Sequence, residues 1–519
     1  MPRFNKTKTT EVVKNHQGGA SIKHSPEVEL VSVLATGLDT GTFYEAPSER
    51  EKRIAELVEK VGNKNPELLA KSIVYARSVM GQRSVTHVAA ATAAKSLSGT
   101  NVGAKFFSKR SRTLNKGGVV YRLDDMLEIL SYYMMRNPNK PIPSSMKKGF
   151  KAALESADSY ELAKYQAKGK GVSLVDAVNL FHPKPSAGME KYFKELVEGT
   201  LKQFNTAEDK NTASGQAVAK KVKSGEISKE QAATELSEAK AENWKELVES
   251  GKIGYIALLR NLRNIVTQAS NSTFDLALEL LTNEVAIRKS LVFPHQIDLA
   301  FEVLMIEGSI PTDKRNKLLS AVNTAYELAV PNLEGVFHGN TAVVFDTSAS
   351  MTSAAVGVSG KRTTAKPVDK ATLIAATLAK GIGADVYHFA DRCEKISVNP
   401  LDTVNSIKTK LSSYTGRVGH GTAFTSIFQA LKGYDRVFVI SDMQGGDSIV
   451  SNSSYQNYIK MYGQPYVYAI DLVGYGTTMF KNNHKLINLF GYSKDIYEAI
   501  KTAEIDPYSI LKEIEKIEL

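Results

Sequence analysis

Residues 341–351 read TAVVFDTSASM, and this stretch decides how the second part of the chain folds. Its first five residues are mostly β-branched or aromatic, a composition typical of a strand buried on both faces. The apolar run stops at Asp346, and the hydroxyl-bearing Ser348 and Ser350 follow within four positions. A carboxylate and two hydroxyls at the end of a buried strand require a structural or functional explanation.

The chain after residue 335 repeats this pattern of short apolar runs separated by helical segments. Three further runs predict strands at 384–389, 436–441 and 465–473. Helices are expected between the strands, at 369–380, 424–432 and 452–462. Because nearly continuous apolar strands alternate with helices, residues 336–519 are expected to form a doubly wound α/β domain around a parallel sheet that is covered on both faces.

Three loops at the predicted strand ends carry oxygen-bearing side chains. In doubly wound sheets ligands bind outside the carboxyl ends of the strands, so these loops are expected to meet. Their oxygen donors are Asp346, Ser348, Ser350, Thr422 and Asp442. An all-oxygen set suits a hard divalent cation, and two carboxylates among neutral hydroxyls leave the ion able to accept a further carboxylate or phosphate. The sequence therefore predicts a site for Mg²⁺ or another divalent cation.

Two other interpretations of the motif compete with a metal site. An Asp followed by small hydroxylated residues also forms helix N-caps and Asx turns. Phosphatases of the haloacid dehalogenase type begin with an apolar strand and a nucleophilic Asp, but they carry a second Asp two residues later, where this chain has Ser348. The sequence also contains no P-loop and no G-x-S-x-G motif. We therefore expect a protein that is not an enzyme.

The first 335 residues have a helical pattern from about residue 46 onward. Asn65 and Pro66 form a typical helix start, and further helices are expected near 123–136, 145–155, 188–203, 252–270, 273–290, 294–308 and 312–329. Many helices without strands indicate an α-solenoid or a large bundle. Residues 206–250 are charged, rich in Ala and poor in large apolar side chains, and we expect them to form a protruding insertion rather than part of the core.

Charge and composition bound the possible partners. Residues 1–335 hold 47 basic and 38 acidic side chains, whereas residues 336–519 hold 19 and 17. The basic excess of the first region fits either an ordinary solvated surface or a polyanionic partner such as nucleic acid. No run approaches 18 uncharged apolar residues, the N-terminus lacks the apolar core of a secretory signal, and the single Cys393 fits a reducing compartment. We expect a cytoplasmic protein without a membrane partner.

The motifs resemble two known modules. The donors Asp346, Ser348, Ser350, Thr422 and Asp442 resemble the metal-ion-dependent adhesion site of von Willebrand factor A domains. Residues 1–335 resemble the TROVE module of the Ro autoantigen family and its bacterial orthologues. The stretches that carry this resemblance are NHQGG (15–19), SPEVELVSVLATG (25–37), TFYE (42–45), AKSIVYARSVMGQRSVTHV (70–88), ALLRNLRNI (257–265) and FPHQIDLAFEVL (293–304).

The resemblance implies a ring of HEAT-like helical repeats followed by the A domain. Members of the family bind small noncoding Y RNAs on a basic outer face and the single-stranded 3′ ends of misfolded RNAs in the central hole. They act as scaffolds in RNA quality control, and bacterial forms can work with an exoribonuclease. The resemblance thus implies a protein that is monomeric within a ribonucleoprotein, with small structured RNA and single-stranded RNA ends as its partners.

Carried over by position, the Y RNA surface of the family falls on residues 163–186. The matching side chains are Lys164, Lys168, Lys170, His182 and Lys184. Lysines stand here where the family favours arginines, and a lysine offers phosphate only a point charge without the bidentate fork. The alternative is a solvated lysine loop. The alternative for the protein as a whole is a metal-dependent protein-interaction scaffold that has no role in RNA binding.

Two further sets of basic residues allow two interpretations each. Arg260 and Arg263 are three positions apart on an expected helix, where they either meet RNA or brace neighbouring helices. Arg77, Arg83 and His87 lie at an expected corner between helices, with the same two possibilities.

Overall fold

The computed structural model describes residues 11–37, 44–111, 113–166, 171–201, 217–218, 220–224, 226–251, 253–290, 292, 297, 310–329, 337, 339–353, 366–447, 453–481, 483, 485–491 and 509–519. The chain divides into two compact units. The first unit contains Met1–Leu201, Glu334–Pro400 and Lys408–Leu519, and the second contains Lys202–Leu333 and Leu401–Ile407. The domain boundary predicted between residues 335 and 336 follows chain order, whereas the compact units unite the first 201 residues with most of the α/β region.

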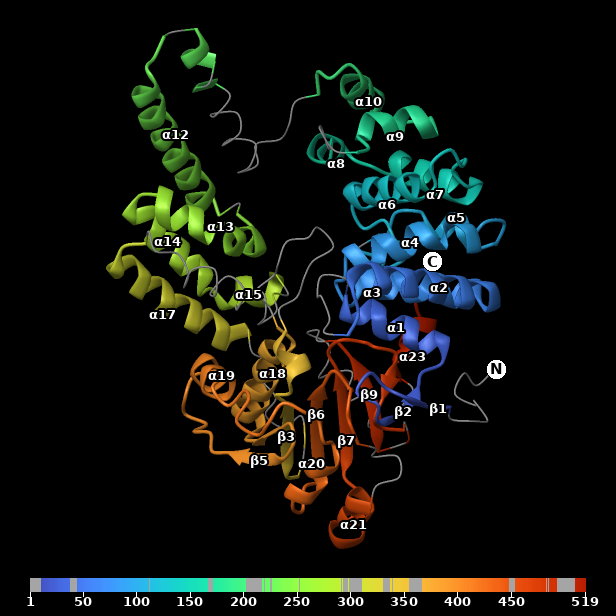
Figure 1. The fold of residues 1–519 in the computed structure, drawn as a ribbon. Helices are drawn as coiled ribbons and strands as arrows, with labels where there is room; N and C mark the ends of the chain where they lie inside the picture. The colour runs from blue at the N-terminus through green and yellow to red at the C-terminus, as the bar shows by residue number, and fades with distance from the viewer. Residues whose placement is uncertain are drawn as a thin grey trace. The chain divides into compact units, whose positions relative to one another are not determined.

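The helical part of the first unit is a two-layer stack (Figure 1). Helices α1, α3, α5, α7 and α9 contact one another in succession, and α2, α4 and α6 do the same in the other layer. This is the arrangement of a solenoid built from helix pairs. The bounds are α1 Pro26–Thr36, α2 Pro47–Lys64, α3 Pro66–Ser78, α4 Ser84–Ser96, α5 Gly103–Phe106, α6 Leu123–Arg136, α7 Ser144–Glu155, α8 Ser159–Lys164, α9 Leu174–Phe181 and α10 Glu190–Val197.

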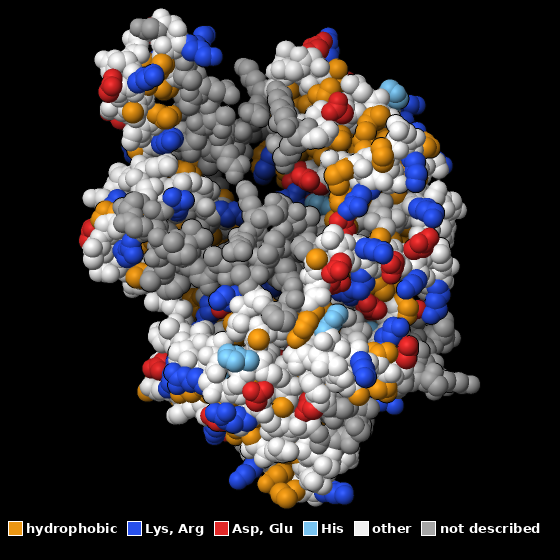
Figure 2. Space-filling model, viewed as in Figure 1, with side chains coloured by type: hydrophobic (Ala, Val, Ile, Leu, Met, Phe, Trp, Pro, Cys, Tyr) orange, Lys and Arg blue, Asp and Glu red, His pale blue; other side chains and the backbone are white. Residues whose placement is uncertain are grey.

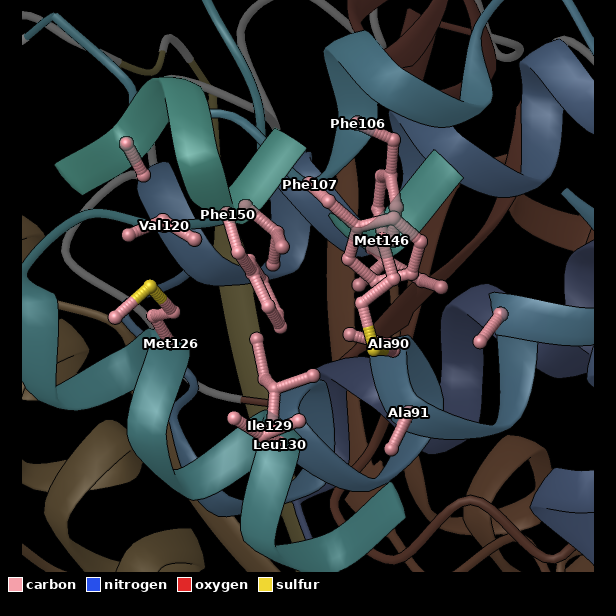
Figure 3. Packing of buried hydrophobic residues seen from close by; sticks show 14 of the residues in the cluster. Ala90, Ala91, Phe106, Phe107, Val120, Met126, Ile129, Leu130, Met146 and Phe150 are labelled. Carbon is pink, nitrogen blue, oxygen red and sulfur yellow. The ribbon is translucent and has the colours of Figure 1, made fainter. Parts of the chain in front are cut away.

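The apolar faces of these helices bury one continuous core. Phe106, Phe107, Phe150 and Phe181 form a chain of edge-on aromatic contacts with ring centroids 4.8, 5.4 and 5.7 Å apart. Figure 3 shows the first three of these rings among side chains of α6 and α7. Such offset aromatic pairs stabilise a core beyond their buried area, so this chain of rings ties α5, α7 and α9 together.

The α/β region forms a six-stranded sheet in the order β5-β4-β3-β6-β7-β9. The strands are β3 Thr341–Asp346, β4 Asp385–Phe389, β5 Cys393–Ile396, β6 Arg436–Ser441, β7 Tyr466–Asp471 and β9 Leu486–Phe490. All neighbours pair in parallel except β4 and β5, which are antiparallel. The chain starts in the middle of the sheet at β3 and builds outward in both directions, which is the doubly wound topology that the sequence predicts.

Helices cover both faces of this sheet. Ala342 and Val344 of β3 pack in one apolar cluster with side chains from residues 424–431 and 455–458. Alternation along the strand turns Val343 and Phe345 to the other face, and α18 packs against β3. The flanking helices are α18 Pro367–Ile382, α19 Val404–Ser412, α20 Thr425–Ala430 and α21 Ser453–Tyr462.

The N-terminal segment forms a second, smaller sheet with the α/β region. Strands β1 (Val12–Lys14) and β2 (Ala20–Lys23) form an antiparallel hairpin, and β2 pairs with β8 (Thr477–Thr478). Helix α1 contacts β9, and the C-terminal helix α23 (Ser509–Glu515) contacts α3. These contacts explain why the first 201 residues and the α/β region form one compact unit.

The second unit is helical and corrects one prediction. Its helices are α12 Lys229–Glu249, α13 Tyr255–Gln268, α14 Asn271–Leu281, α15 Glu284–Ser290 and α17 Thr312–Ala329. Residues 206–250 were expected to protrude, but α12 packs against α13 and α14. Trp244 is 2% exposed, and its indole Nε1 donates to Oε1 of Gln268 over 3.1 Å. The prediction was therefore wrong for the C-terminal end of α12, where Trp244, Leu247 and Val248 are buried, because a few apolar side chains on one helical face suffice to dock a mostly charged helix.

None of the helices in the described ranges is long and apolar enough to cross a membrane.

Candidate functional site

The three predicted loops meet at the carboxyl end of the sheet and are hydrogen-bonded to one another. The Ser441 hydroxyl, at the end of β6, donates to Oδ2 of Asp346 over 2.6 Å. The backbone amide of Ala349 donates to the carbonyl of His420 over 3.1 Å, and the amide of Gly446 donates to the carbonyl of Thr422 over 2.9 Å. Each loop is thus held by both of the others, which places the five predicted donors in one region.

The first loop folds back on its own carboxylate. The Ser348 amide donates to Oδ1 of Asp346 over 2.8 Å, and the hydroxyls of Ser348 and Ser350 lie 3.2 Å apart. The exposed fraction is 0% for Asp346 and Ser348 and 4% for Ser350. This backbone geometry is the Asx turn that was considered as an alternative, and it gathers one carboxylate and two hydroxyls at one buried point.

Asp442 supplies the second carboxylate from the neighbouring strand. The backbone amide of Gln444 donates to Oδ1 of Asp442 over 3.1 Å. Oδ2 of Asp442 is buried and has no hydrogen-bond partner. A buried carboxylate oxygen without a donor is costly, so a cation bound at this point would stabilise it.

The electrostatics of the two carboxylates support the same interpretation. Burial raises the pKa of Asp346 to about 6, although hydrogen bonds from Ser441 and Ser348 act in the opposite direction. Burial and the negative charge of Asp346 raise the pKa of Asp442 well above its ordinary value. Two buried acids that repel each other are stabilised in their ionised forms by a divalent cation between them.

The donor set fits a hard cation better than a zinc-type site. Among the described residues, no group of three or more His, Cys, Asp or Glu side chains is placed to hold a metal ion. In the predicted set only Asp346 and Asp442 are acidic, and the other three donors are hydroxyls. Mg²⁺ binds few carboxylates and keeps several waters, so such a set is compatible with it.

One contact to this region comes from a segment that the sequence analysis did not assign to the site. Nε2 of Gln17, in the turn between β1 and β2, donates to the Thr422 hydroxyl over 2.9 Å. Thr422 itself is 4% exposed. The two residues are 405 positions apart, and no local pattern in the sequence connects them.

The residues predicted to contact RNA in the first unit are exposed where the structure describes them. Lys164 ends α8, where its ammonium group lies 3.0 Å from the hydroxyl of Tyr160. His182 ends α9 in the left-handed conformation, with φ 45°. The backbone amide of Lys184 donates to Glu155 over 2.8 Å, and its side chain is exposed. Lys168 and Lys170 lie outside the described residues.

Arg260 and Arg263 lie on α13 in the second unit. Both are exposed, whereas Leu258, Leu259 and Leu262 on the same helix are buried. The two arginines therefore project from the polar face of α13.

Arg77, Arg83 and His87 have a structural role. Arg77 donates to Oδ2 of Asp125 over 2.9 Å, Arg83 donates to Oδ1 over 3.2 Å, and Nε2 of His87 lies 2.9 Å from Oδ1. Asp125 is fully buried, and hydrogen bonds and positive charge from His87 and Arg77 lower its pKa far below the ordinary range despite burial. These residues connect α3, α4 and α6. Of the two interpretations, RNA contact or bracing of neighbouring helices, the structure supports the second.

Figure 2 shows one face of the molecule, on which basic side chains are interspersed with acidic ones over the helical stack. This pattern differs from a single dense basic patch. RNA phosphates on this face would therefore contact individual Lys or Arg side chains rather than one continuous basic surface.

Comparisons with known proteins agree with this architecture. The family model described as the TROVE domain matches residues 28–238 and 228–304. The crystal structure of the Ro (RSR) protein of Deinococcus radiodurans matches with a TM-score of 0.56 at 19% sequence identity, and the match covers 92% of this chain and 100% of that chain. A comparison with curated proteins gives no match.

Proposed function

The chain belongs to the TROVE domain family, and on that premise we propose that it binds RNA and acts as a noncatalytic scaffold. The single observation that carries this proposal is the family match, which spans more than half of the chain. The net positive charge of residues 1–335 supports it, because a basic surface attracts the phosphate backbone of RNA. We infer that one partner is a small structured RNA of the Y RNA type and that another is the single-stranded 3′ end of misfolded RNA.

The surface proposed for structured RNA is formed by residues 163–186. Lys164 is the last residue of α8, Lys184 lies in the segment between α9 and α10, and both are exposed, so each can meet a different phosphate. The imidazole of His182 is exposed beside them in sequence and can donate to a phosphate or stack on a base. For single-stranded ends, the exposed Arg260 and Arg263 are the candidates in the second unit.

The salt dependence of RNA binding tests this surface. Changing Lys164 and Lys184 together to Glu should weaken binding of a structured RNA. The slope of the logarithm of the binding constant against the logarithm of the salt concentration should fall in magnitude by roughly 1 to 2, because RNA binding releases fewer counterions when fewer phosphates are neutralised. The matched control changes the exposed lysines Lys410 and Lys460 to Glu, which alters net charge equally at distant positions. Equal losses in both variants would show that only net charge matters and would refute the assignment.

We propose that Asp346, Ser348, Ser350, Thr422 and Asp442 hold Mg²⁺. The buried, unpartnered Oδ2 of Asp442 supports this proposal. When bound, the ion supplies a positive charge that can accept a carboxylate or phosphate oxygen. Isothermal titration of the metal-free protein with Mg²⁺ should show binding that Asp442→Ala abolishes, with RNA affinity unchanged. Equal Mg²⁺ binding by wild type and variant would refute the site.

The site residues do not favour catalysis. Ser348 stands where a phosphatase of the haloacid dehalogenase type needs its second Asp, and its hydroxyl, 3.2 Å from that of Ser350, does not replace a carboxyl group as general acid or base. We therefore propose that an exoribonuclease, if RNA is degraded on this scaffold, is supplied by a partner protein.

A further inference from the structure

The turn at residues 15–19 contacts two of the loops that form the proposed metal site. Gln17 donates from its side-chain amide to the hydroxyl of Thr422, one of the five proposed ligands. All five proposed ligands are at most 4% exposed in this arrangement. The N-terminal segment therefore contacts one proposed ligand directly, in an arrangement in which all five are shielded from solvent.

This turn is internally rigid. The Asn15 carboxamide oxygen accepts from the backbone amides of Gln17 and Gly19 over 2.9 and 3.1 Å. The amide of Asn15 donates to the carbonyl of Gly19 over 2.9 Å, and the amide of Gly18 donates back to the carbonyl of Asn15. Gly18 has φ 84°, a left-handed conformation that glycine adopts without strain. The backbone that carries Gln17 is thus fixed, and the Gln17 side chain is held by its hydrogen bond to Thr422.

The turn also fits closely against the loop that follows β6. Nδ2 of Asn15 donates to the carbonyl of Gly445 over 2.8 Å, and the amide of His16 donates to Oε1 of Gln444 over 3.0 Å. A Cβ atom added to Gly19 would stand 2.1 Å from the carbonyl oxygen of Gly445. The two backbones approach so closely that only glycine fits, so the contact is a specific interface.

Tyr44 packs against the same turn. Its ring stacks on His16, with centroids 5.2 Å apart and planes within 5°, and meets the ring of Tyr475 edge-on. The ring of Tyr44 thus packs against the turn that carries Gln17.

We propose that Gln17 is the built-in occupant of the ligand face of the metal site, so that the bound cation clamps the N-terminal turn to the α/β region. This inference rests on the proposed metal site. It implies that an acidic group from another molecule reaches the cation only after residues 15–19 move away. According to this proposal, the metal site connects the N-terminal turn to the α/β region within one chain, and binding to another molecule requires that this connection open first.

Hydrogen exchange of the intact protein tests the clamp. The backbone amides of residues 15–19 are all hydrogen-bonded, so their exchange reports the opening of the turn. If opening releases the ion, Mg²⁺ at about 100 times its dissociation constant should slow their exchange by up to about 100-fold relative to EDTA. Exchange of these amides that is unchanged by Mg²⁺, in protein shown by titration to bind it, would overturn the clamp while leaving the metal site standing.

A charge substitution gives a second, signed test. Gln17→Glu places a third carboxylate at the ligand face, so Mg²⁺ should bind at least about tenfold more tightly by isothermal titration. In EDTA the same variant should exchange faster at residues 15–19, because the new carboxylate repels Asp346 and Asp442. The matched control is Lys14→Gln, which lowers the net charge by the same amount on the exposed side of β1.

The outcomes of the two tests separate the two proposals. Mg²⁺ affinity of Gln17→Glu equal to that of Lys14→Gln would show that Gln17 does not face the ion and would overturn the clamp. Absence of Mg²⁺ binding in the wild-type protein would instead refute the metal site on which the clamp rests. Slower exchange with Mg²⁺ in wild type, together with tighter binding in Gln17→Glu, is the result that we expect.

Discussion

Asp125 shows how a single buried carboxylate can organise three helices. Its two oxygens accept from Arg77, Arg83, His87 and the backbone amides of residues 121 and 122. Removal of one partner from a buried ionic group leaves the others uncompensated, which costs far more than the loss of an exposed pair.

We expect Asp125→Asn to destabilise the first unit by about 3–5 kcal/mol, because Arg77 and His87 would remain buried without their charge partner. The control is Glu59→Gln, which breaks an exposed pair with Lys95 and should cost no more than about 1 kcal/mol. Urea unfolding followed by circular dichroism measures both. Equal effects in the two variants would show that the Asp125 cluster is not what holds these helices.

Because His24 is buried, the first unit is expected to lose folding stability at acidic pH. Its ring is 9% exposed, packs edge-on against Phe490 at 5.3 Å, and has a buried Nε2 without a hydrogen-bond partner. Burial lowers its pKa from 6.5 to about 4. Since the unfolded chain takes up the proton first, the stability contributed by neutral His24 is present above pH 6.5 and is lost as the pH falls toward 4.

His24→Phe removes this titration while keeping an aromatic ring. Wild type should lose roughly 3 kcal/mol more stability than the variant between pH 7.5 and pH 4, the amount that corresponds to the pKa difference. Unfolding midpoints measured across this pH range provide the comparison. Parallel pH profiles for the two proteins would contradict the assignment. The low pKa of Asp125 places its own loss of stability at still more acidic pH.

At the residue scale, the meeting of the loops that carry the five proposed ligands could be predicted, whereas the contact from Gln17 could not. Asp346 and Asp442 each follow an apolar strand, and the rule that parallel strands bring their carboxyl ends together makes them neighbours. Gln17 meets Thr422 through tertiary docking across 405 positions. No periodicity or motif encodes such a contact, although the Gly-Gly pair in NHQGG marks a turn that needs close backbone approach.

At the scale of elements, the long and strongly patterned segments could be predicted and the short ones could not. Helix α6 spans Leu123–Arg136 and β6 spans Arg436–Ser441, as expected. The edge strand β5 was missed because its four residues include two exposed charged side chains and carry no apolar run. The helix expected at 273–290 is in fact two helices, α14 and α15, because Asn283 caps the backbone amide of Ala286 and starts a new helix.

Helix α12 gives the element-scale prediction. We expect Trp244→Ala to destabilise the second unit by about 3–5 kcal/mol, because it empties a buried site between α12 and its neighbours. Glu242→Ala, on the exposed face of the same helix, is the control and should change stability by less than about 0.5 kcal/mol. Hydrogen exchange of α13 and α14 measures the effect. Unchanged hydrogen exchange of α13 and α14 in Trp244→Ala would show that Trp244 does not hold α12 against these helices.

At the scale of the whole molecule, the compact units do not follow the order of the chain. The N-terminal hairpin joins β8, α1 contacts β9 and α23 contacts α3, so both ends of the chain contribute to the first unit. The sequence could predict the two kinds of structure, helical and α/β, because each has its own local pattern. It could not predict how they divide into units, because that depends on contacts between segments hundreds of residues apart.

This division predicts that the two units respond differently to metal. All the proposed ligands and the clamping residues belong to the first unit, whereas the only tryptophan, Trp244, lies in the second. Mg²⁺ at about 100 times its dissociation constant should stabilise the first unit by about 2.7 kcal/mol, because the ion binds only its folded form. Tryptophan fluorescence should then show an unfolding midpoint that Mg²⁺ leaves unchanged, while hydrogen exchange in β3, β6 and the N-terminal hairpin becomes slower. A Mg²⁺-dependent shift in the tryptophan signal that persists in Asp442→Ala would show that the ion acts elsewhere, since that variant lacks a proposed ligand of the site.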